Sequence, residues 1–399
     1  MGSEMCIRDR FMTRFYIIRH AEAEGNLYRR VHGWYDSLIT DNGYRQIAAL
    51  AGRFQDVPID AVYSSDLFRT RTTAGAIWKP RALALHTRSD LREIGVGAWE
   101  DRTWGDLERH DAQELLRFNH SAPEFRVEGA ETFDQVQTRM KRALLDLARL
   151  HPEQTVAVFS HGTAIRCLQG ALRGLGPGEM DALGHSDNTA VTCLEVEDGQ
   201  ARILFENDNS HLPEEISTLA RQRWWKEQGG RAADANLWFR PLDMQNEAAW
   251  YRAARQDAWL DIHGSRIPFD GEGFVNDALR CWRQDPAQAV VCAMRGDETV
   301  GVLQLDLERH AGQDVGYIPF VYMTPQHRKQ GLGVQLIGQA VSVYRPLGRR
   351  YLRLRCAPDN AVAQRFYRKY GFIKVGEDKG ARITLDLLEK YIGYEPNQA

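Results

Sequence analysis

The chain has few of the features that mark membrane, secreted or nucleic-acid-binding proteins. Among its 399 residues no apolar stretch is long enough to span a bilayer, and the N-terminus lacks the apolar core of a signal peptide. The formal net charge is only −3, which argues against nucleic acid as the main partner. We therefore expect a cytoplasmic protein whose partners include neither a membrane nor nucleic acid.

Cysteine is scarce as well. The chain has six cysteines in neither paired nor metal-ligand spacing, at Cys6, Cys167, Cys193, Cys281, Cys292 and Cys356. Reduced thiols in a cytosolic protein are the economical interpretation, and no metal site is expected.

The length exceeds that of one ordinary domain, since about 150 residues per domain suggests two or three. Residues 1–11 are expected to be a non-native leader, because the first strand begins directly after Met12. An amphipathic helix over 214–226, with adjacent tryptophans that we expect to dock on one domain or both, precedes a pair of glycines. The predicted domains are 12–212 and 237–399, joined by a helical linker over 213–236.

Two apolar runs in the first half end on a histidine. Phe15 to Ile18 is followed by Arg19 and His20, and Thr155 to Phe159 is followed by Ser160-His161-Gly162 before a predicted helix. Ligands bind at the carboxyl ends of the strands of an open parallel sheet. One histidine in such a place is more often a hydrogen-bonded structural residue than a catalyst, but two of them favour chemistry.

Further charged residues follow other short runs. Arg69 comes after the run Ala61 to Tyr63, and Glu93 lies in a glycine-rich loop. The planar fork of arginine binds phosphate oxygens bidentately and stays charged. Two histidines, two arginines and one glutamate therefore predict a phosphate site, although Glu93 by itself could also be a loop glutamate at the surface.

Over 12–212 the chain resembles the histidine phosphatase superfamily, in its phosphoglycerate-mutase-like branch. Four motifs occur in the family's order: Arg19-His20 with Glu22 and Asn26, Asp36 to Thr40 leading into Gly43 and Gln46, Ser65 to Arg69, and Ser160-His161-Gly162. The resemblance implies an α/β fold with a three-layer αβα arrangement. The chain has Ala21 where the family usually has glycine and Asp66 where it usually has proline, and neither change removes a charge-bearing atom.

The resemblance implies a role for each motif residue. His20 is the nucleophile that forms a phosphohistidine, which requires one neutral ring nitrogen while the other donates to a carbonyl. Glu93 acts first as acid and then as base. The remaining residues bind the phosphoryl group: Arg19 and Arg69 as the clamp, His161 as a charged donor, and Asn26 and Thr163 as secondary contacts.

The segment Asp106 to Val127 is the predicted cap over this site. Its basic residues are scattered among acids and apolar residues: Arg109, His110, Arg117, His120 and Arg126. A bisphosphate clamp would need them clustered. Hydrolysis of a small phosphomonoester is therefore favoured, by family analogy, over the alternative of a phosphomutase.

The second half has another pattern. A strand at Leu237 to Arg240 precedes helices near 242–260 and 273–283, and strands follow at 289–294, 299–307 and 314–323. Gly331 and Gly333 then open a helix through about Val343, so that free backbone N–H groups and the helix dipole point at an anion. A strand over 350–355 and a helix over 359–370, capped by Asp359 or Asn360, complete the pattern.

Arg328 to Gly333 and Asn360 to Phe372 resemble the GNAT acetyltransferase family over 237–388. The resemblance implies an α+β domain with a mixed sheet, acetyl-coenzyme A as co-substrate and an amine as acceptor. The implied cofactor-binding residues are Met323, Arg328, Gln330, Gly331, Gly333, Val334 and Asn360. The two glycines alone also fit a plain loop-to-helix turn.

Tyr367 would protonate the departing thiolate, although it could instead be a core aromatic beside Phe366. No general base follows from the sequence, because the candidates are equivalent: Asp306, Glu308, Asp314, Tyr322, or water relayed to a backbone carbonyl. We expect a bifunctional enzyme, with a phosphatase carrying a non-catalytic module for coenzyme A or substrate as the alternative. The natural substrates and the oligomeric state stay open.

Overall fold

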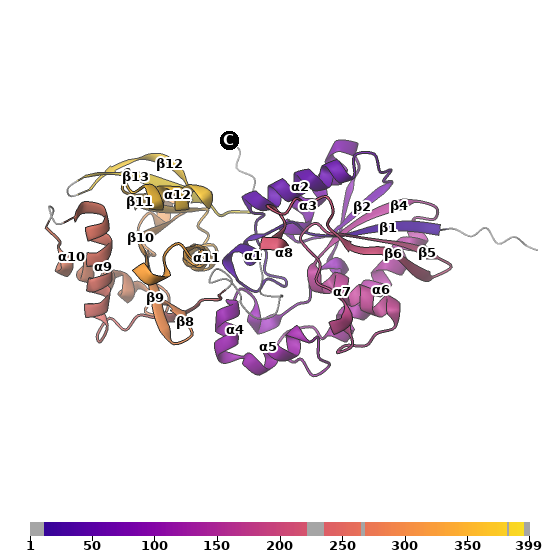
Figure 1. Cartoon of the computed structure of the whole chain (residues 1–399), viewed down its shortest axis with the longest axis horizontal. Coiled ribbons are helices and arrows are strands. Elements are labelled where there is room, and N and C mark those ends of the chain that lie inside the picture. Colours follow the sequence, from indigo (N-terminus) through magenta and orange to yellow (C-terminus); the bar gives the residue numbers. More distant parts are fainter. Residues whose placement is uncertain (1–11, 222–234, 265–267, 381–382, 395–399) are drawn as a thin grey trace, which may run out of the picture. The chain divides into compact units, whose positions relative to one another are not determined.

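The computed structural model describes residues 12–221, 235–264, 268–380 and 383–394, and these divide into two compact units (Figure 1). The first comprises 12–25, 31–100 and 111–221; the second comprises 26–30, 101–110 and 235–394. Of the predicted linker helix, α8 (Thr218–Arg221) lies within this range. The predicted leader and the two linker tryptophans lie outside the described residues.

The first unit is built on a six-stranded sheet with the order β3-β2-β4-β1-β5-β6. Neighbours among β3, β2, β4 and β1 are parallel, and β5 and β6 are antiparallel. The strands are β1 (Met12–Arg19), β2 (Ala61–Ser65), β3 (Leu85–Arg88), β4 (Thr155–Ser160), β5 (Val191–Glu197) and β6 (Gln200–Asp208). The buried apolar runs of β1 and β4 lie at the centre, as expected for strands covered on both faces.

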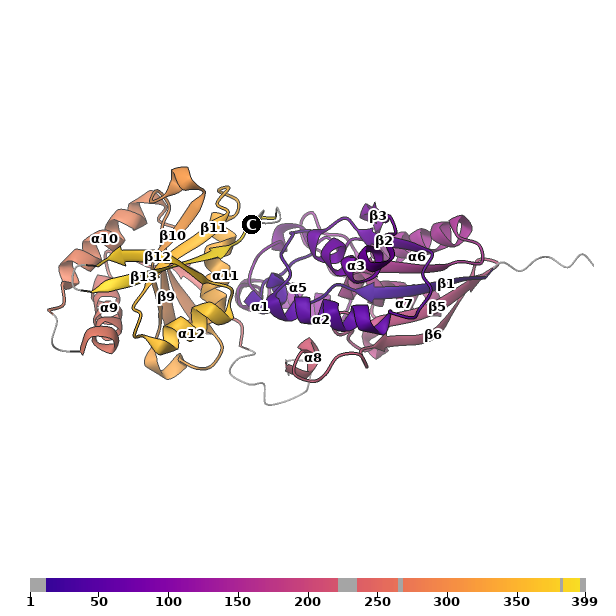
Figure 2. The same cartoon turned by 90° about the horizontal axis from the view of Figure 1, so that it is seen from above.

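Helices cover both faces of this sheet (Figures 1 and 2). On one face, α2 (Asp41–Arg53) and α3 (Phe68–Arg81) share an apolar core with the central strands, and on the other lie α6 (Phe133–Leu150) and α7 (Gly162–Arg173). Thr132 and Gln135 form a capping box that begins α6. The shorter helices of this half of the chain are α1 (Glu24–Tyr28), α4 (Trp104–His110) and α5 (Ala112–Asn119). The unit is the three-layer αβα domain that the sequence predicted.

The second unit contains a seven-stranded sheet with the order β12-β13-β11-β10-β9-β8-β7. Only β10 and β11 pair in parallel within it, so the sheet is mixed. The strands are β7 (Trp238–Pro241), β8 (Val290–Arg295), β9 (Glu298–Asp306), β10 (Val315–Met323), β11 (Tyr351–Cys356), β12 (Ile373–Lys379) and β13 (Thr384–Tyr391). One core packs α9 (Ala248–His263) and α10 (Gly271–Gln284) on the sheet, and another packs α11 (Gly333–Tyr344) and α12 (Ala361–Lys369).

Two details of the second unit differ from the sequence prediction. α9 begins at Ala248 and not near Leu242, because Asp243 binds the N–H groups of two following residues and Glu247 binds its N–H in turn, which forms a turn before the helix. The hairpin β12–β13 was not predicted.

Two further findings concern the cysteines and the helices of the described ranges. The five cysteines within them are free and buried. No helix in these ranges combines the length and the apolar character needed to cross a membrane.

Candidate active site

Candidate catalytic residues follow the carboxyl ends of four strands of the first unit. The last residues of the parallel neighbours β1 and β4 are in register, so His20 and His161, which follow them, have ring centroids 5.2 Å apart. β2 leads into Arg69 in the first turn of α3, and β3 leads through a short turn to Glu93. The structure therefore brings together the candidates that the sequence placed at strand ends.

His20 is held in one tautomer. Its ring is 2% exposed, and Nδ1 lies 2.8 Å from the carbonyl oxygen of Ala21. Because a carbonyl only accepts, Nδ1 carries the proton and Nε2 keeps its lone pair. Burial, followed by the charges of Arg69 and Arg19, holds the pKa of His20 well below its usual value. The His20 ring is therefore neutral at neutral pH.

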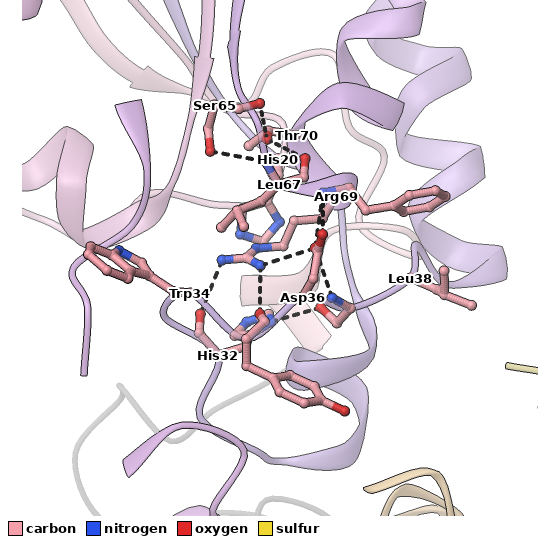
Figure 3. Close-up of polar contacts among 12 residues, drawn as sticks. His20, His32, Trp34, Asp36, Leu38, Ser65, Leu67, Arg69 and Thr70 are labelled. Atoms are coloured by element: carbon pink, nitrogen blue, oxygen red, sulfur yellow. Dashed lines mark hydrogen bonds and ion pairs between the residues drawn. The ribbon is translucent and has the colours of Figure 1, made fainter. Parts of the chain in front are cut away.

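The two arginines are anchored by backbone carbonyls. Arg19 donates to the carbonyl of Ser186, and the fully buried Arg69 donates to three carbonyls of the loop that begins at His32. Figure 3 shows the Arg69 guanidinium beside this loop, which also carries Asp36. In both arginines Nε is buried and has no hydrogen-bond partner among the described residues. Buried unpaired donors of this kind are rare and suit a site that binds an anion.

His161 and Glu93 meet at the start of α7. The carboxylate oxygens of Glu93 accept the N–H groups of Thr163 at 3.0 Å and Ala164 at 2.8 Å. Both ring nitrogens of His161 are buried and without a partner among the described residues. Burial and then Arg69 lower the pKa of His161 well below its usual value, so the ring by itself is neutral. Its role as a charged donor to a phosphoryl group stays a prediction. Because the Thr163 N–H donates to Glu93, only the Thr163 hydroxyl is left for the predicted contact with phosphate.

Gly162 makes room for the first arginine. A Cβ on Gly162 would lie 3.2 Å from Nε of Arg19, closer than side chains normally approach. The Ser160-His161-Gly162 motif therefore places a histidine and an unobstructed helix start next to Arg19.

His32 is a third histidine that the sequence analysis missed. Its ring centroid lies 5.8 Å from that of His20, and its Nδ1 lies 3.1 Å from the Ser37 hydroxyl. Burial and then Arg69 hold its pKa well below the usual value. A Cβ on Gly25 would overlap the His32 ring, so this ring depends on that glycine. The sequence signal that could have identified His32 was its position between Asn26 and Asp36, two residues of the family motifs.

Ala21 and Asp66, the two residues that differ from the usual family pattern, each have a hydrogen-bond partner. The N–H of Ala21 donates to the Thr73 hydroxyl at 2.9 Å. Asp66 forms a bidentate ion pair with Arg92. An ion pair thus braces the loop where the family usually has proline.

The remaining predicted residues of the first half are Asn26 and the basic residues of the predicted cap. Asn26 lies in α1 and belongs by its contacts to the second unit, as do Arg109 and His110. The other basic residues of the predicted cap have protein partners. Arg117 pairs with Glu114, Arg126 donates to two nearby carbonyls, and His120 pairs with Asp181.

In the second unit, a glycine-containing loop joins β10 to α11. Lys329 and Gly331 have left-handed backbone, with φ of +62° and +80°. Gly333 is the first residue of α11, and its missing Cβ would lie 3.3 Å from the ring of Phe366. Gln330 has a buried side-chain oxygen without a partner among the described residues, and Val334 is buried in the first turn of α11. The loop therefore leads to a helix N-terminus whose N–H groups suit a pyrophosphate.

Three other predicted cofactor residues have protein partners. Arg328 forms ion pairs with Asp257 and Asp261 of α9, and its Nε donates to the Met323 carbonyl, so its charge is directed to α9. Asn360 caps α12 by accepting the Ala363 N–H at 3.0 Å.

Tyr367 lies on α12 between aromatic rings. Phe366 and Phe372 each lie 5.3 Å from its ring, and burial raises the pKa of its phenol, so the group keeps its proton. Among the candidate bases, Tyr322 donates to Asp257 at 3.0 Å and burial raises its pKa to about 12. Asp306 is paired with Arg280.

Several known proteins match about half of the chain. A probable phosphoglycerate mutase, GpmB, of Photorhabdus laumondii is 32% identical over 164 residues, which make up 41% of this chain and 76% of that protein. Phosphoserine phosphatase 1 of Hydrogenobacter thermophilus is 28% identical over 203 residues, 51% of this chain and 96% of that protein. YhfR of Bacillus stearothermophilus is a solved structure with 30% identity and a TM-score of 0.48 that covers 50% of this chain and 98% of its own.

Family matches follow the same division. Residues 15–209 match the histidine phosphatase superfamily (branch 1), and residues 250–372 match the acetyltransferase (GNAT) family. The chain belongs to the histidine phosphatase superfamily through its first half and to the GNAT family through its second.

Proposed function

We propose that residues 12–212 hydrolyse small phosphomonoesters through a phosphohistidine on His20. One observation carries the proposal: a neutral His20 ring whose Nδ1 is bound to a carbonyl lies beside His161, the partly buried Arg19 and the fully buried Arg69. A phosphoryl group there would find a nucleophile on one side and fixed positive charge around its oxygens.

In the first step, Nε2 of His20 forms a bond to phosphorus while the ester P–O bond breaks. Arg19 and Arg69 stabilise the charge on the equatorial oxygens, and the nearby dianion favours protonation of His161, which then donates to one of them. Glu93 gives a proton to the departing alkoxide. The products are the free alcohol and a phosphohistidine.

In the second step, water attacks phosphorus and the P–N bond to His20 breaks. Glu93 takes the proton from the water, so the carboxyl group returns to its starting state. Inorganic phosphate leaves and His20 is neutral again. The hydrogen bonds from the start of α7 fix the carboxyl group of Glu93 during both steps.

Hydrolysis is supported over mutase activity by the predicted cap. Arg117 and Arg126 have partners within the predicted cap and His120 pairs with Asp181, so they do not form a second clamp for a bisphosphate. The relative from Hydrogenobacter thermophilus is a phosphoserine phosphatase. A phosphomutase is the second candidate, because the relative from Photorhabdus laumondii is a probable phosphoglycerate mutase.

The experiment is release of phosphate from an aryl phosphate and from a set of phosphorylated metabolites. The wild-type protein should hydrolyse them and the His20→Ala variant should not. Unchanged hydrolysis by that variant would refute the proposal. Transfer of labelled phosphoryl to a second hydroxyl at a rate above that of hydrolysis would support the mutase instead.

We further propose that residues 237–399 transfer an acetyl group from acetyl-coenzyme A to an amine. Acetyl-coenzyme A supplies the activated acetyl group. The N–H groups from Gln330 to Val334 would bind its pyrophosphate, and the left-handed backbone at Gly331 supports that assignment. Tyr367 keeps its proton and would donate it to the thiolate.

A non-catalytic coenzyme A module is the alternative for this half. It is favoured by the arginine partners of Asp257 and Asp306, which leave these carboxylates poorly suited to act as bases. Acetyl-coenzyme A incubated with a library of amines decides between the two. Release of free coenzyme A that the Tyr367→Phe variant slows would support transfer, whereas binding without release would support the module.

A further inference from the structure

Arg69 is held by the loop that begins at His32, through three backbone carbonyls and a longer ion pair with Asp36 at 3.7 Å. The Arg69 guanidinium donates to the carbonyls of His32 at 3.2 Å, Gly33 at 2.7 Å and Tyr35 at 3.1 Å. These bonds fix where the terminal nitrogens lie. A carbonyl oxygen stays in place only if its own peptide unit is held, so the loop determines the position of the cation.

The N–H groups of the same loop converge on one carboxylate. Glu100 accepts from the N–H of Gly33 at 3.1 Å, Trp34 at 2.7 Å and Tyr35 at 2.7 Å. It also accepts the N–H of Val96 at 3.3 Å. A Cβ on Gly33 would lie 2.6 Å from a Glu100 oxygen, so the loop and the carboxylate fit closely.

Two peptide units make both sets of bonds. The unit joining residues 32 and 33 directs its N–H to Glu100 and its carbonyl to Arg69, and the unit joining residues 33 and 34 does the same. Hydrogen bonds in such a chain polarise one another, because an anion stands at one end and a cation at the other. Burial lowers the pKa of Arg69, and the charges of Asp36, then Glu93 and then Glu100 oppose that effect.

We infer that Glu100 is a positioning residue of the phosphate clamp: it acts on Arg69 through the peptide units of residues 32–34 without touching the phosphoryl group. This inference rests on the proposed phosphatase function. A carboxylate in direct contact with the terminal nitrogens would compete with phosphate for them. Glu100 lies one peptide layer away, so it supports the cation without contacting its terminal nitrogens, one of which lies 3.7 Å from Asp36.

The kinetic test is a double-mutant cycle between Glu100→Gln and Arg69→Ala with an aryl phosphate. The amide of Gln turns a donor toward N–H groups, so Glu100→Gln should lower kcat/KM by about 10- to 100-fold through misplacement of Arg69. In the Arg69→Ala background the same change should have less than about a twofold effect, because coupled residues are not additive. Equal losses in both backgrounds would overturn the inference.

Glu195→Gln is the matched control. Glu195 on β5 is a buried carboxylate that is bound by Arg14 of β1 and Arg202 of β6. Its replacement should lower the melting temperature but leave kcat/KM unchanged. If Glu100→Gln behaved in the same way, with lower stability and unaltered kinetics, Glu100 would have only a structural role.

A second measurement does not depend on turnover. In NMR spectra of protein with labelled arginine, the terminal nitrogens of Arg69 should give separate signals in the wild type and in Glu195→Gln, since three carbonyls hold them. They should merge in Glu100→Gln, and an unchanged pattern there would overturn the inference. If the wild type hydrolyses no phosphate ester, the proposed function fails while this measurement still decides the role of Glu100.

Discussion

The proposed anion-binding sites of the two units are built in different ways. The first gathers polar side chains from four separate segments, and His20, Arg69 and His161 are all buried. The second offers the backbone N–H groups of one continuous loop before α11, while the nearby charge of Arg328 is taken up by α9. Side chains gathered in this way can form and break bonds to phosphorus, whereas a backbone loop can only hold a phosphate.

The difference also sets how sensitive each site is to substitution. Buried cations and neutral histidines depend on their neighbours, so a single change in the first unit should remove most of the activity. A loop of N–H groups has no side chain to lose. It should be weakened mainly by changes to its backbone conformation.

Replacement of Arg69 should have the largest effect among the residues around His20. Arg69→Ala should lower kcat/KM for an aryl phosphate by about 100- to 1,000-fold, because a fixed positive charge on the transferring group is lost. Steady-state kinetics checks this. Arg53→Ala, which breaks an ion pair with Asp208 on the same unit, serves as the control and should keep its activity. A loss of kcat/KM of similar size in both variants would contradict a specific role for Arg69 in phosphate binding.

Glu93→Gln should have an effect that depends on the leaving group. With an alkyl phosphate, the departing alkoxide needs a proton, and the rate of phosphoenzyme formation should fall by about 100-fold or more. An aryl phosphate has a better leaving group, so formation of the phosphoenzyme should fall much less. Rapid-mixing experiments with both substrates measure the ratio. Equal losses would show that Glu93 supports the structure and not the proton transfer.

The histidines at the first site should make that unit less stable in acid. Because burial holds the pKa values of His20 and His161 below 6.5, the unfolded chain binds protons that the folded chain does not. Stability should therefore fall as pH drops below about 6.5, by up to about 1.4 kcal/mol per pH unit for each histidine. Denaturant unfolding between about pH 7 and pH 5 measures this, and His161→Asn should reduce the slope. An unaltered slope would contradict the neutral state assigned to His161.

The smallest predicted change concerns the loop of the second unit. Gly331 and Gly348 both have left-handed backbone, with φ of +80° and +73°. Replacement of either by alanine should cost about 1 kcal/mol of stability. Only Gly331→Ala should also weaken coenzyme A binding, by about tenfold, which calorimetric titration can detect. Equal affinity in the two variants would argue against a phosphate site at this loop.

The sequence predicted the parts of the first site that follow apolar strands. His20 and His161 each end such a run, and parallel register places them together. His32 and Glu100 were missed because they lie in irregular loops, where no periodic pattern marks which side chain turns inward. Their roles arise from hydrogen bonds between segments far apart in the chain.

In the second unit the order of elements through β11 and α12 followed from the sequence, but two features did not. The direction of Arg328 depends on the spacing of Asp257 and Asp261 on α9, four residues apart and on one helix face. The strands β12 and β13 form an edge hairpin. The exposed side chains of Ile373 and Val375 on β12 obscure the alternation that would have predicted it.

The most direct test of the account is capture of the phosphoenzyme. An aryl phosphate carrying labelled phosphorus, quenched within a single turnover in alkali, should leave an acid-labile label on the peptide that contains His20, and His20→Ala should carry none. Hydrolysis without such a label, or a label on another residue, would contradict the phosphohistidine on His20.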